Sequence, residues 1–272
     1  MSIVADHSGA LAPLRLLARP RRIAIVCIVV LVASGWAALG LMLADTTLLA
    51  ALCQPNGGAA DITQAALVLA MWCAMALAMM LPTAAPMILT YAELAETAAQ
   101  KGEPAASPLV LTVGYIGVWL SAAVALSALQ LILARLALLD PGLVTASPLF
   151  SGALFIAAGL YQFSALKHAC VTQCQHPFRF FFAKWTSEPR GVFRLGVRQG
   201  LYCLGCCWAM MLLMFALGVM NVIWMAALGA IMASEKLNTT TRFSRRLGAA
   251  FILVGAAFIV SSVVAHWPVR AG

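Results

Sequence analysis

Charge is what this sequence has least of. Charged residues make up 10% of its 272 residues, whereas an ordinary soluble domain carries about a quarter. Apolar residues make up 63% and come in blocks close to the ~20 residues that cross a bilayer. The blocks are continuous rather than alternating, which excludes a transmembrane β-barrel. The sequence therefore predicts an all-α, polytopic transmembrane helical bundle that has the lipid bilayer as its surroundings.

Motifs of common enzyme classes are missing as well. The chain has neither a P-loop nor the glycine fingerprint of a dinucleotide site. Its 4 histidines are scattered, and no carboxylate is placed to orient one of them inside the membrane, which excludes Ser-His-Asp catalysis. The net charge of +8 lies between the apolar blocks, where it sets orientation in the membrane and does not indicate nucleic acid. These absences favour a role other than catalysis.

Hydropathy predicts seven spans, with the amino terminus in the cytoplasm. In this arrangement every Lys and Arg except Arg135 and Arg270 lies on the inside, as the positive-inside rule requires. The sixth span is the shortest, so a five-span chain with a re-entrant hairpin at 218–236 is the main alternative. The predicted spans are 23–44, 67–91, 109–134, 148–169, 199–217, 220–235 and 247–267.

The predicted domain organisation follows from these spans. A basic cytoplasmic amino terminus covers 1–22, and its positive charge precedes an apolar block that is too long for a signal peptide. One transmembrane domain covers 23–267, and 268–272 form a short outer tail. The basic, aromatic linker near 175–198 is predicted to lie on the cytoplasmic membrane surface as an amphipathic segment.

Sulfur, in contrast, is abundant and concentrated between Gly200 and Met214. On an α-helix the sulfur residues of this uncharged stretch stand at spacings of three and four, so they share one broad face. Thiolate and thioether sulfurs suit Cu(I), and thiolates also suit Zn(II). Buried cysteines and gap-filling methionines explain the same pattern by packing alone. The candidate ligands of this stretch are Cys203, Cys206, Cys207, Met210, Met211 and Met214.

The second predicted span is also rich in methionine. Met71, Met75 and Met79 follow one another at helical spacing, and Pro82 and Pro86 come directly after them. These prolines disturb the inner half of the helix and release backbone carbonyls, which membranes tolerate mainly where they face protein or a water-filled cavity. Met75 and Met79 are therefore candidate ligands, with a methionine-filled core as the alternative, and Met71 is assigned to packing.

A second cysteine cluster follows the fourth predicted span. Cys170 and Cys174 are one helical turn apart, and His168 and His176 flank them as possible secondary ligands. At ~1.5 Å per residue this cluster reaches a depth similar to that of Cys203, although its spacing differs from that of zinc knuckles. We therefore predict that the two cysteine clusters form one pocket near the inner leaflet.

Single residues in the other spans carry further predictions. Glu235 ends the sixth span and is a possible secondary cation ligand, with a simple ion pair to its neighbour Lys236 as the alternative. Gly152 and Gly159 predict close helix packing at the fourth span. Cys53 has no clear partner in its outer segment, so no disulfide framework is predicted.

Several of these motifs resemble those of a bacterial family of predicted metal-binding integral membrane proteins, classed as a domain of unknown function, in which some members carry the label copper chaperone. The resemblance covers residues 70 to 240. Two positions depart from the pattern, because Val171 stands where leucine is expected and Gln175 where arginine is expected. The shared motifs are M-W-x-x-M-x-x-A-M-M-L-P-x-x-x-P-M at Met71–Met87, Lys167 with Cys170, Cys174 and Pro177, G-x-Y-C-L-G-C-C-W-x-x-M at Gly200–Met211, G-x-M-N at Gly218–Asn221, and Glu235 with Lys236.

The resemblance implies metal binding in a bacterial inner membrane, and together with the sulfur clusters it favours Cu(I), with Zn(II) or no metal as alternatives. The protein would then serve copper delivery, uptake or homeostasis, with a metallochaperone or a metalloenzyme client as its partner. Methionine sites would exchange the ion easily, and the inner cysteines would hold it tightly.

Two functions from other classes remain open. Cys203 and Cys206 form a C-x-x-C pair, which predicts a membrane thiol-disulfide oxidoreductase. An outward-facing partner pair is missing, and inner cysteines lie in a reducing compartment. The third possibility is a structural or assembly subunit whose cysteines and methionines only pack.

Overall fold

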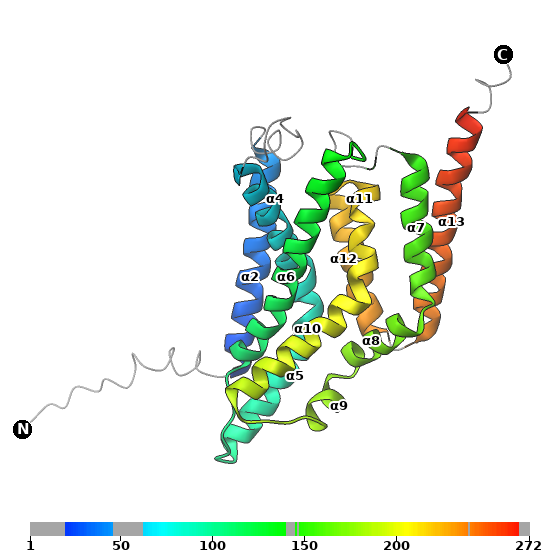
Figure 1. Cartoon of the computed structure of the whole chain (residues 1–272). Helices are drawn as coiled ribbons and strands as arrows, with labels where there is room; N and C mark the ends of the chain where they lie inside the picture. The colour runs from blue at the N-terminus through cyan, green and yellow to red at the C-terminus, as the bar shows by residue number, and fades with distance from the viewer. Residues whose placement is uncertain (1–19, 46–61, 140–144, 146, 239, 267–272) are drawn as a thin grey trace, which may run out of the picture.

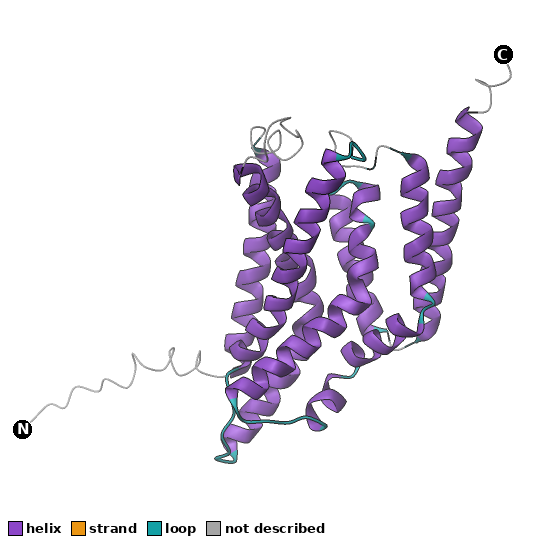
Figure 2. Ribbon diagram, in the orientation of Figure 1, coloured by secondary structure: helices purple, strands orange, loops and turns teal. Residues whose placement is uncertain are grey.

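The computed structural model describes residues 20–45, 62–139, 145, 147–238 and 240–266. Within these ranges every regular element is a helix (Figure 2), and one isolated antiparallel bridge joins Leu139 to Thr145. The elements are α2 (Pro20–Ala44), α4 (Ile62–Met75), η1 (Ala76–Met80), α5 (Leu81–Gln100), α6 (Pro108–Arg135), α7 (Pro148–Gln162), α8 (Ala165–Gln175), α9 (Pro177–Phe182), α10 (Pro189–Leu212), α11 (Met214–Leu217), α12 (Val222–Leu237) and α13 (Thr241–His266).

Among the described residues, five continuous helical segments are long and apolar enough to cross a membrane. A sixth is possible if α7 and α8, which meet at an angle of 65°, form one broken span. The chain is therefore a membrane-embedded helical protein. The five segments are Pro20–Ala44, Ile62–Gln100, Pro108–Arg135, Pro189–Leu217 and Thr241–Val264.

The predicted seven spans are not found among the described helices. The predicted span at 220–235 corresponds to α12, which has 16 residues and at ~1.5 Å per residue is too short to cross a ~30 Å hydrocarbon core. The predicted span at 148–169 is the bent α7–α8 pair. Sequence reasoning placed a single helix there because its apolar run continues through the bend at Phe163 and Ser164.

Two of the five segments form the centre of the bundle. In the most apolar windows of Pro189–Leu217 and Ile62–Gln100, 61% and 56% of the residues are buried, whereas the corresponding windows of α2 and α13 are 22% and 17% buried. Figure 1 shows α2 and α13 on opposite sides of the bundle, with α10 between them. The two segments that the sequence identified as rich in sulfur are therefore the two that face protein.

Glycines allow the closest helix contacts. A Cβ on Gly152 would lie 2.8 Å from the carbonyl oxygen of Gly255, and a Cβ on Gly159 would lie 2.8 Å from that of Gly248. These contacts join α7 to α13, which run side by side in Figure 1. The prediction of close packing at Gly152 and Gly159 is confirmed.

The proline-containing segment departs from regular helix one turn before its first proline. Residues Ala76–Met80 form the π-helix η1, and α5 then continues through Pro86. A π-helical turn holds one more residue than an α-helical turn and so changes which carbonyls are free. The carbonyl of Met80 accepts hydrogen bonds from the hydroxyls of Thr83 (2.8 Å) and Tyr115 (3.0 Å). This carbonyl thus faces protein.

The predicted 175–198 linker is largely helical. α9 occupies its start, and α10 begins at Pro189, ten residues before the predicted span. Phe181 is buried against the ring of Tyr91, with centroids 5.4 Å apart, whereas Phe178 and Phe182 are exposed. The position of the 175–198 linker at the membrane surface stays a prediction. We call the end of the bundle that carries α8 and α9 the α8–α9 end (Figure 1).

Candidate metal centre

Three thiols of α10 lie together inside the bundle. The sulfurs of Cys203, Cys206 and Cys207 are all within 4.8 Å of one another, and each residue is only 1% exposed. The thiol of Cys206 donates to the carbonyl of Cys203 at 3.1 Å, and its sulfur lies 3.3 Å from that of Cys207. Within the described residues, this is the group of His, Cys, Asp and Glu side chains whose geometry could hold a metal ion.

A lysine and a tyrosine cover the sulfur of Cys203. The ammonium of Lys236, at the end of α12, donates to this sulfur at 2.9 Å and to the hydroxyl of Thr83 on α5 at 2.6 Å. The hydroxyl of Tyr115, on α6, lies 3.0 Å from the same sulfur. Four helices therefore meet at Cys203, and the only full charge that reaches it from the described residues is positive.

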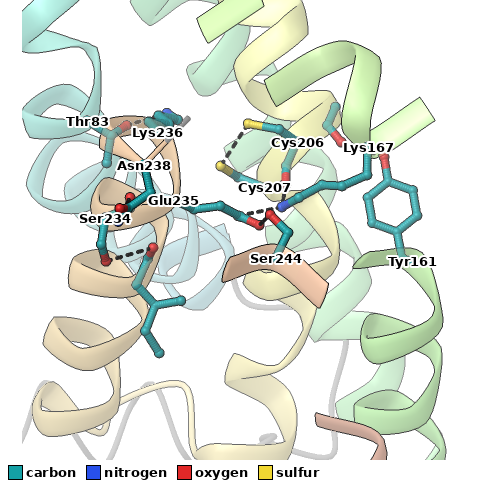
Figure 3. Close-up of polar contacts among 12 residues, drawn as sticks. Thr83, Tyr161, Lys167, Cys206, Cys207, Ser234, Glu235, Lys236, Asn238 and Ser244 are labelled. Carbon is teal, nitrogen blue, oxygen red and sulfur yellow. Dashed lines mark hydrogen bonds and ion pairs between the residues drawn. The ribbon is translucent and has the colours of Figure 1, made fainter. Parts of the chain in front are cut away.

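A buried ion pair supports the neighbouring turn of α10. Figure 3 shows the ammonium of Lys167 on α8 reaching the carboxylate of Glu235, at 2.7 Å, and the backbone carbonyl of Cys206, at 2.5 Å. The other carboxylate oxygen accepts a hydrogen bond of 2.6 Å from Ser244 on α13. Both side chains of the pair are at most 2% exposed. This network joins α8, α10, α12 and α13 beside the three thiols.

The alternative considered for Glu235, an ion pair with its neighbour Lys236, is wrong. Adjacent side chains on a helix point about 100° apart, so Glu235 reaches Lys167 while Lys236 reaches Cys203. Both carboxylate oxygens of Glu235 have partners, so it serves as the counter-ion of Lys167 in this structure.

The second cysteine cluster lies against α10. A Cβ on Gly205 would lie 2.7 Å from the sulfur of Cys170, so this thiol rests directly on the glycine. The thiol of Cys174, one turn later on α8, is close enough to interact with that of Cys206. The hydroxyl of Tyr161 donates to the carbonyl of Gly205 at 2.5 Å and holds this contact from α7. The two cysteine clusters are therefore neighbours.

The candidate methionines belong to the same buried core. None of them is more than 2% exposed. Met79 also lies against Gly229 of α12, where an added Cβ would be 3.7 Å from its Cγ. The side chains in question are Met75 and Met79 from α4 and η1, Met210 and Met211 from α10, and Met214 from α11.

The two histidines do not join the cysteines. His168 is exposed on α8, and His176 lines a polar pocket together with Arg179 and Lys184. Neither belongs to the group of close metal-ligand atoms found among the described residues. The sequence indicated them because they flank Cys170 and Cys174, but neighbours in a helical sequence point in different directions.

Comparison with known proteins adds a family. The family described as PpoB2, copper chaperone, matches residues 69–258. The chain belongs to this copper chaperone family. The match covers most of the chain and includes every residue of the site described above. The description agrees with the copper chaperone label that the sequence resemblance carried. No curated protein and no solved structure matches the chain.

The polar residues that surround the three thiols were not identified from the sequence as part of the site. Sequence reasoning did not connect Tyr115 or Thr83 with the sulfurs, because both look like ordinary residues in apolar helices. Lys167 and Lys236 did carry a signal, since a charged residue inside a membrane bundle is rare and normally has a specific partner. Lys167 and Lys236 are 1% and 8% exposed, so each is a buried charge beside such a partner.

Proposed function

We propose that this protein binds Cu(I) through its buried thiols and serves copper delivery, uptake or homeostasis in a bacterial inner membrane. The observation that carries the proposal is the group of three sulfurs, from Cys203, Cys206 and Cys207, within 4.8 Å of one another. Sulfur ligands select soft ions such as Cu(I). The copper chaperone family and the membrane-embedded helices support the same function.

The charge of the surrounding shell supports a thiolate-bound ion. Lys167 and Glu235 neutralise each other, which leaves the positive charge of Lys236 beside Cys203. A buried charge needs a partner of opposite sign. Cu(I) bound by two thiolates, with the third sulfur remaining a protonated thiol, carries a net charge of −1, which balances Lys236. Zn(II) bound by three thiolates carries the same charge and is the alternative, and the family description favours copper.

The other cysteines and methionines would form further sites through which the ion moves to or from the three thiols. Cys170 and Cys174 lie beside the cysteines of α10, so their thiols would hold the ion in passing and would not be ligands of the final centre. Thioethers are neutral, so Met75, Met79, Met210, Met211 and Met214 would bind the ion more weakly and exchange it more easily. A soluble metallochaperone or a metalloenzyme is the expected partner for transfer.

A redox function is the competing hypothesis, and burial argues against it. A catalytic thiol must be reached by its substrate disulfide, and reactive cysteines lie in partly exposed positions. Cys203 and Cys206 are each 1% exposed. A purely structural role does not account for a buried ammonium beside a thiol.

Elemental analysis of protein purified in detergent without oxygen tests the proposal. We expect about one copper ion per chain after incubation with Cu(I), and loss of that ion in Cys203→Ser, Cys206→Ser and Cys207→Ser. The matched control is Cys27→Ser, a partly buried thiol of α2, which should leave copper binding unchanged. A folded, reduced wild-type protein that takes up no Cu(I) would reject the proposal, and a trapped mixed disulfide with another protein would favour the redox function.

A further inference from the structure

The thiols next to the site form a gradient of exposure. Cys203, Cys206 and Cys207 are each 1% exposed, and Cys170 is 8% exposed. Cys174 is partly exposed, near the last turn of α8. Since the other four thiols are buried, an ion carrier in water can reach Cys174 before it can reach any other sulfur of this group.

The partly exposed Cys174 lies next to the buried thiols, so an ion that reaches it can be passed to them. The thiol of Cys174 is close enough to interact with that of Cys206, which in turn lies 3.3 Å from the sulfur of Cys207. Cys170, one turn before Cys174, also rests on Gly205 next to Cys206, so these thiols follow one another from the partly exposed end of α8 to the buried face of α10. A Cu(I) ion can follow this line by exchanging one ligand at a time, without ever being released into lipid.

Hydrogen bonds to two neighbouring helices hold the end of α8, and with it Cys174, in place. The amide of Gln175 donates to the backbone carbonyls of Glu235 (3.0 Å) and Asn238 (2.6 Å) at the end of α12. The amide of Gln199 on α10 donates to the carbonyl of Gln173 at 3.4 Å. Two neighbouring helices thus hold the residues on either side of Cys174.

We infer that Cys174 is the receiving thiol of the site: it takes Cu(I) from a thiol-bearing carrier in water and passes it to Cys206, from which Cys203 and Cys207 complete the buried centre. This inference rests on the proposed function. The carrier is identified by chemistry as a small thiol or a cysteine-containing protein that presents Cu(I) at the α8–α9 end.

The transfer balances without a redox partner. Copper remains Cu(I) throughout. In the first step a bond from copper to the sulfur of Cys174 forms as a bond to the carrier sulfur breaks, and the proton of the Cys174 thiol passes to the carrier. In the second step the bond to Cys206 forms as that to Cys174 breaks, and the proton of the Cys206 thiol returns to Cys174.

Loading kinetics separate a receiving thiol from a permanent ligand. Protein in lipid nanodiscs, reduced and free of oxygen, is mixed with the Cu(I)–glutathione complex, and the copper bound is followed over time and at equilibrium. Because a receiving thiol speeds transfer without changing its end point, Cys174→Ser should slow loading by about tenfold or more while the final copper content and the affinity stay within about twofold of wild type. Cys27→Ser is the matched control for loss of a partly buried thiol and should load at the wild-type rate.

The possible outcomes are distinct. Wild-type protein that binds no copper contradicts the proposed function itself. Equal loading rates for wild type and Cys174→Ser, with normal copper content in both, overturn the receiving role alone. Loss of bound copper from folded Cys174→Ser also overturns it, because Cys174 would then be a permanent ligand. Alkylation of the metal-free wild type provides a check that needs no substitution: Cys174 should react before Cys203, Cys206 and Cys207, and the protein alkylated at Cys174 should load as slowly as the variant.

Discussion

The side-chain nitrogen of Lys236 lies 2.9 Å from the sulfur of Cys203, and both residues are buried in a bundle that has few other charges. A lysine held this close to a cysteine stabilises negative charge on the sulfur. Thr83 accepts a second hydrogen bond from the same ammonium and fixes its direction. The ammonium of Lys236 places a positive charge beside the sulfur of Cys203, and the first prediction depends on this charge.

Removing that charge should weaken copper binding. In Lys236→Met the negative charge of the copper–thiolate centre loses its partner, and a hydrogen bond to a charged group contributes about 1.5–3 kcal/mol, so we expect affinity to fall roughly ten- to a hundredfold. Lys236→Arg should keep most of the affinity. Competition with a coloured Cu(I) chelator measures the change. Lys184→Met, at an exposed lysine, is the control, and equal affinities in all variants would refute the role of Lys236.

Breaking the buried ion pair should destabilise the fold. Lys167→Met leaves the carboxylate of Glu235 buried without its cation, which typically costs about 3–5 kcal/mol, whereas the double variant Lys167→Met/Glu235→Met should recover much of this loss. The midpoint of unfolding in mixed SDS micelles provides the measurement.

The exposed pair of Arg21 and Glu93, 3.2 Å apart, offers a matched control for this cycle. Its side chains are 55% and 49% exposed, so breaking it should change the unfolding free energy by no more than about 1 kcal/mol. Equal effects from the two pairs would show that burial of the Lys167–Glu235 pair does not determine its contribution.

Two glycines of α10 should respond differently to alanine. At Gly196 the added Cβ meets the backbone carbonyl of Leu111 on α6, which cannot move aside, so Gly196→Ala should destabilise the protein by about 1–3 kcal/mol. At Gly205 its one close contact is with the sulfur of Cys170, which can rotate away. Gly205→Ala should therefore keep the unfolding midpoint while Cys170 becomes faster to alkylate, as mass spectrometry can show. Unchanged alkylation of Cys170 would contradict the contact.

Removing the hydroxyl of Tyr115 should have a smaller effect. Tyr115→Phe deletes the contacts with Cys203 and with the carbonyl of Met80, but Thr83 still bonds that carbonyl. We expect a loss of about 0.5–1.5 kcal/mol in copper binding, which is a factor of about two to ten. The same chelator competition measures it. A loss as large as that in Lys236→Met would mean that the tyrosine, and not the lysine, controls the centre.

The fold class and the central helices could be predicted from the sequence because both depend on composition. Long apolar runs lead to membrane helices, and stripes of cysteine and methionine mark the faces that avoid lipid. The number of spans could not be predicted in this way. The short sixth apolar run did predict the length of α12, but apolar character alone does not reveal that the chain bends between Gln162 and Ala165.

The cysteines of the site could be predicted from the sequence, but most of the polar contacts between its helices could not. Cys203, Cys206 and Cys207 share a face by their spacing, so their grouping needs no tertiary contact. Lys167 and Glu235 are far apart in the sequence and meet only because α8 packs against α12. Such pairings depend on how helices are arranged in space, which a single sequence does not encode in any local pattern.

The buried network also affects how the protein must be made. Glu235 and Lys236 end a short helix, and a charged side chain left at the centre of a bilayer costs about 2.5–3.5 kcal/mol on translocon scales. Their partners come from α5, α8, α10 and α13, and the serine on α13 is synthesised last. The segment around α12 therefore cannot settle into lipid by itself during synthesis. Its hydrogen bonds are complete only once α13 has been made, so we expect a chain cut short before α13 to be less stable in the membrane.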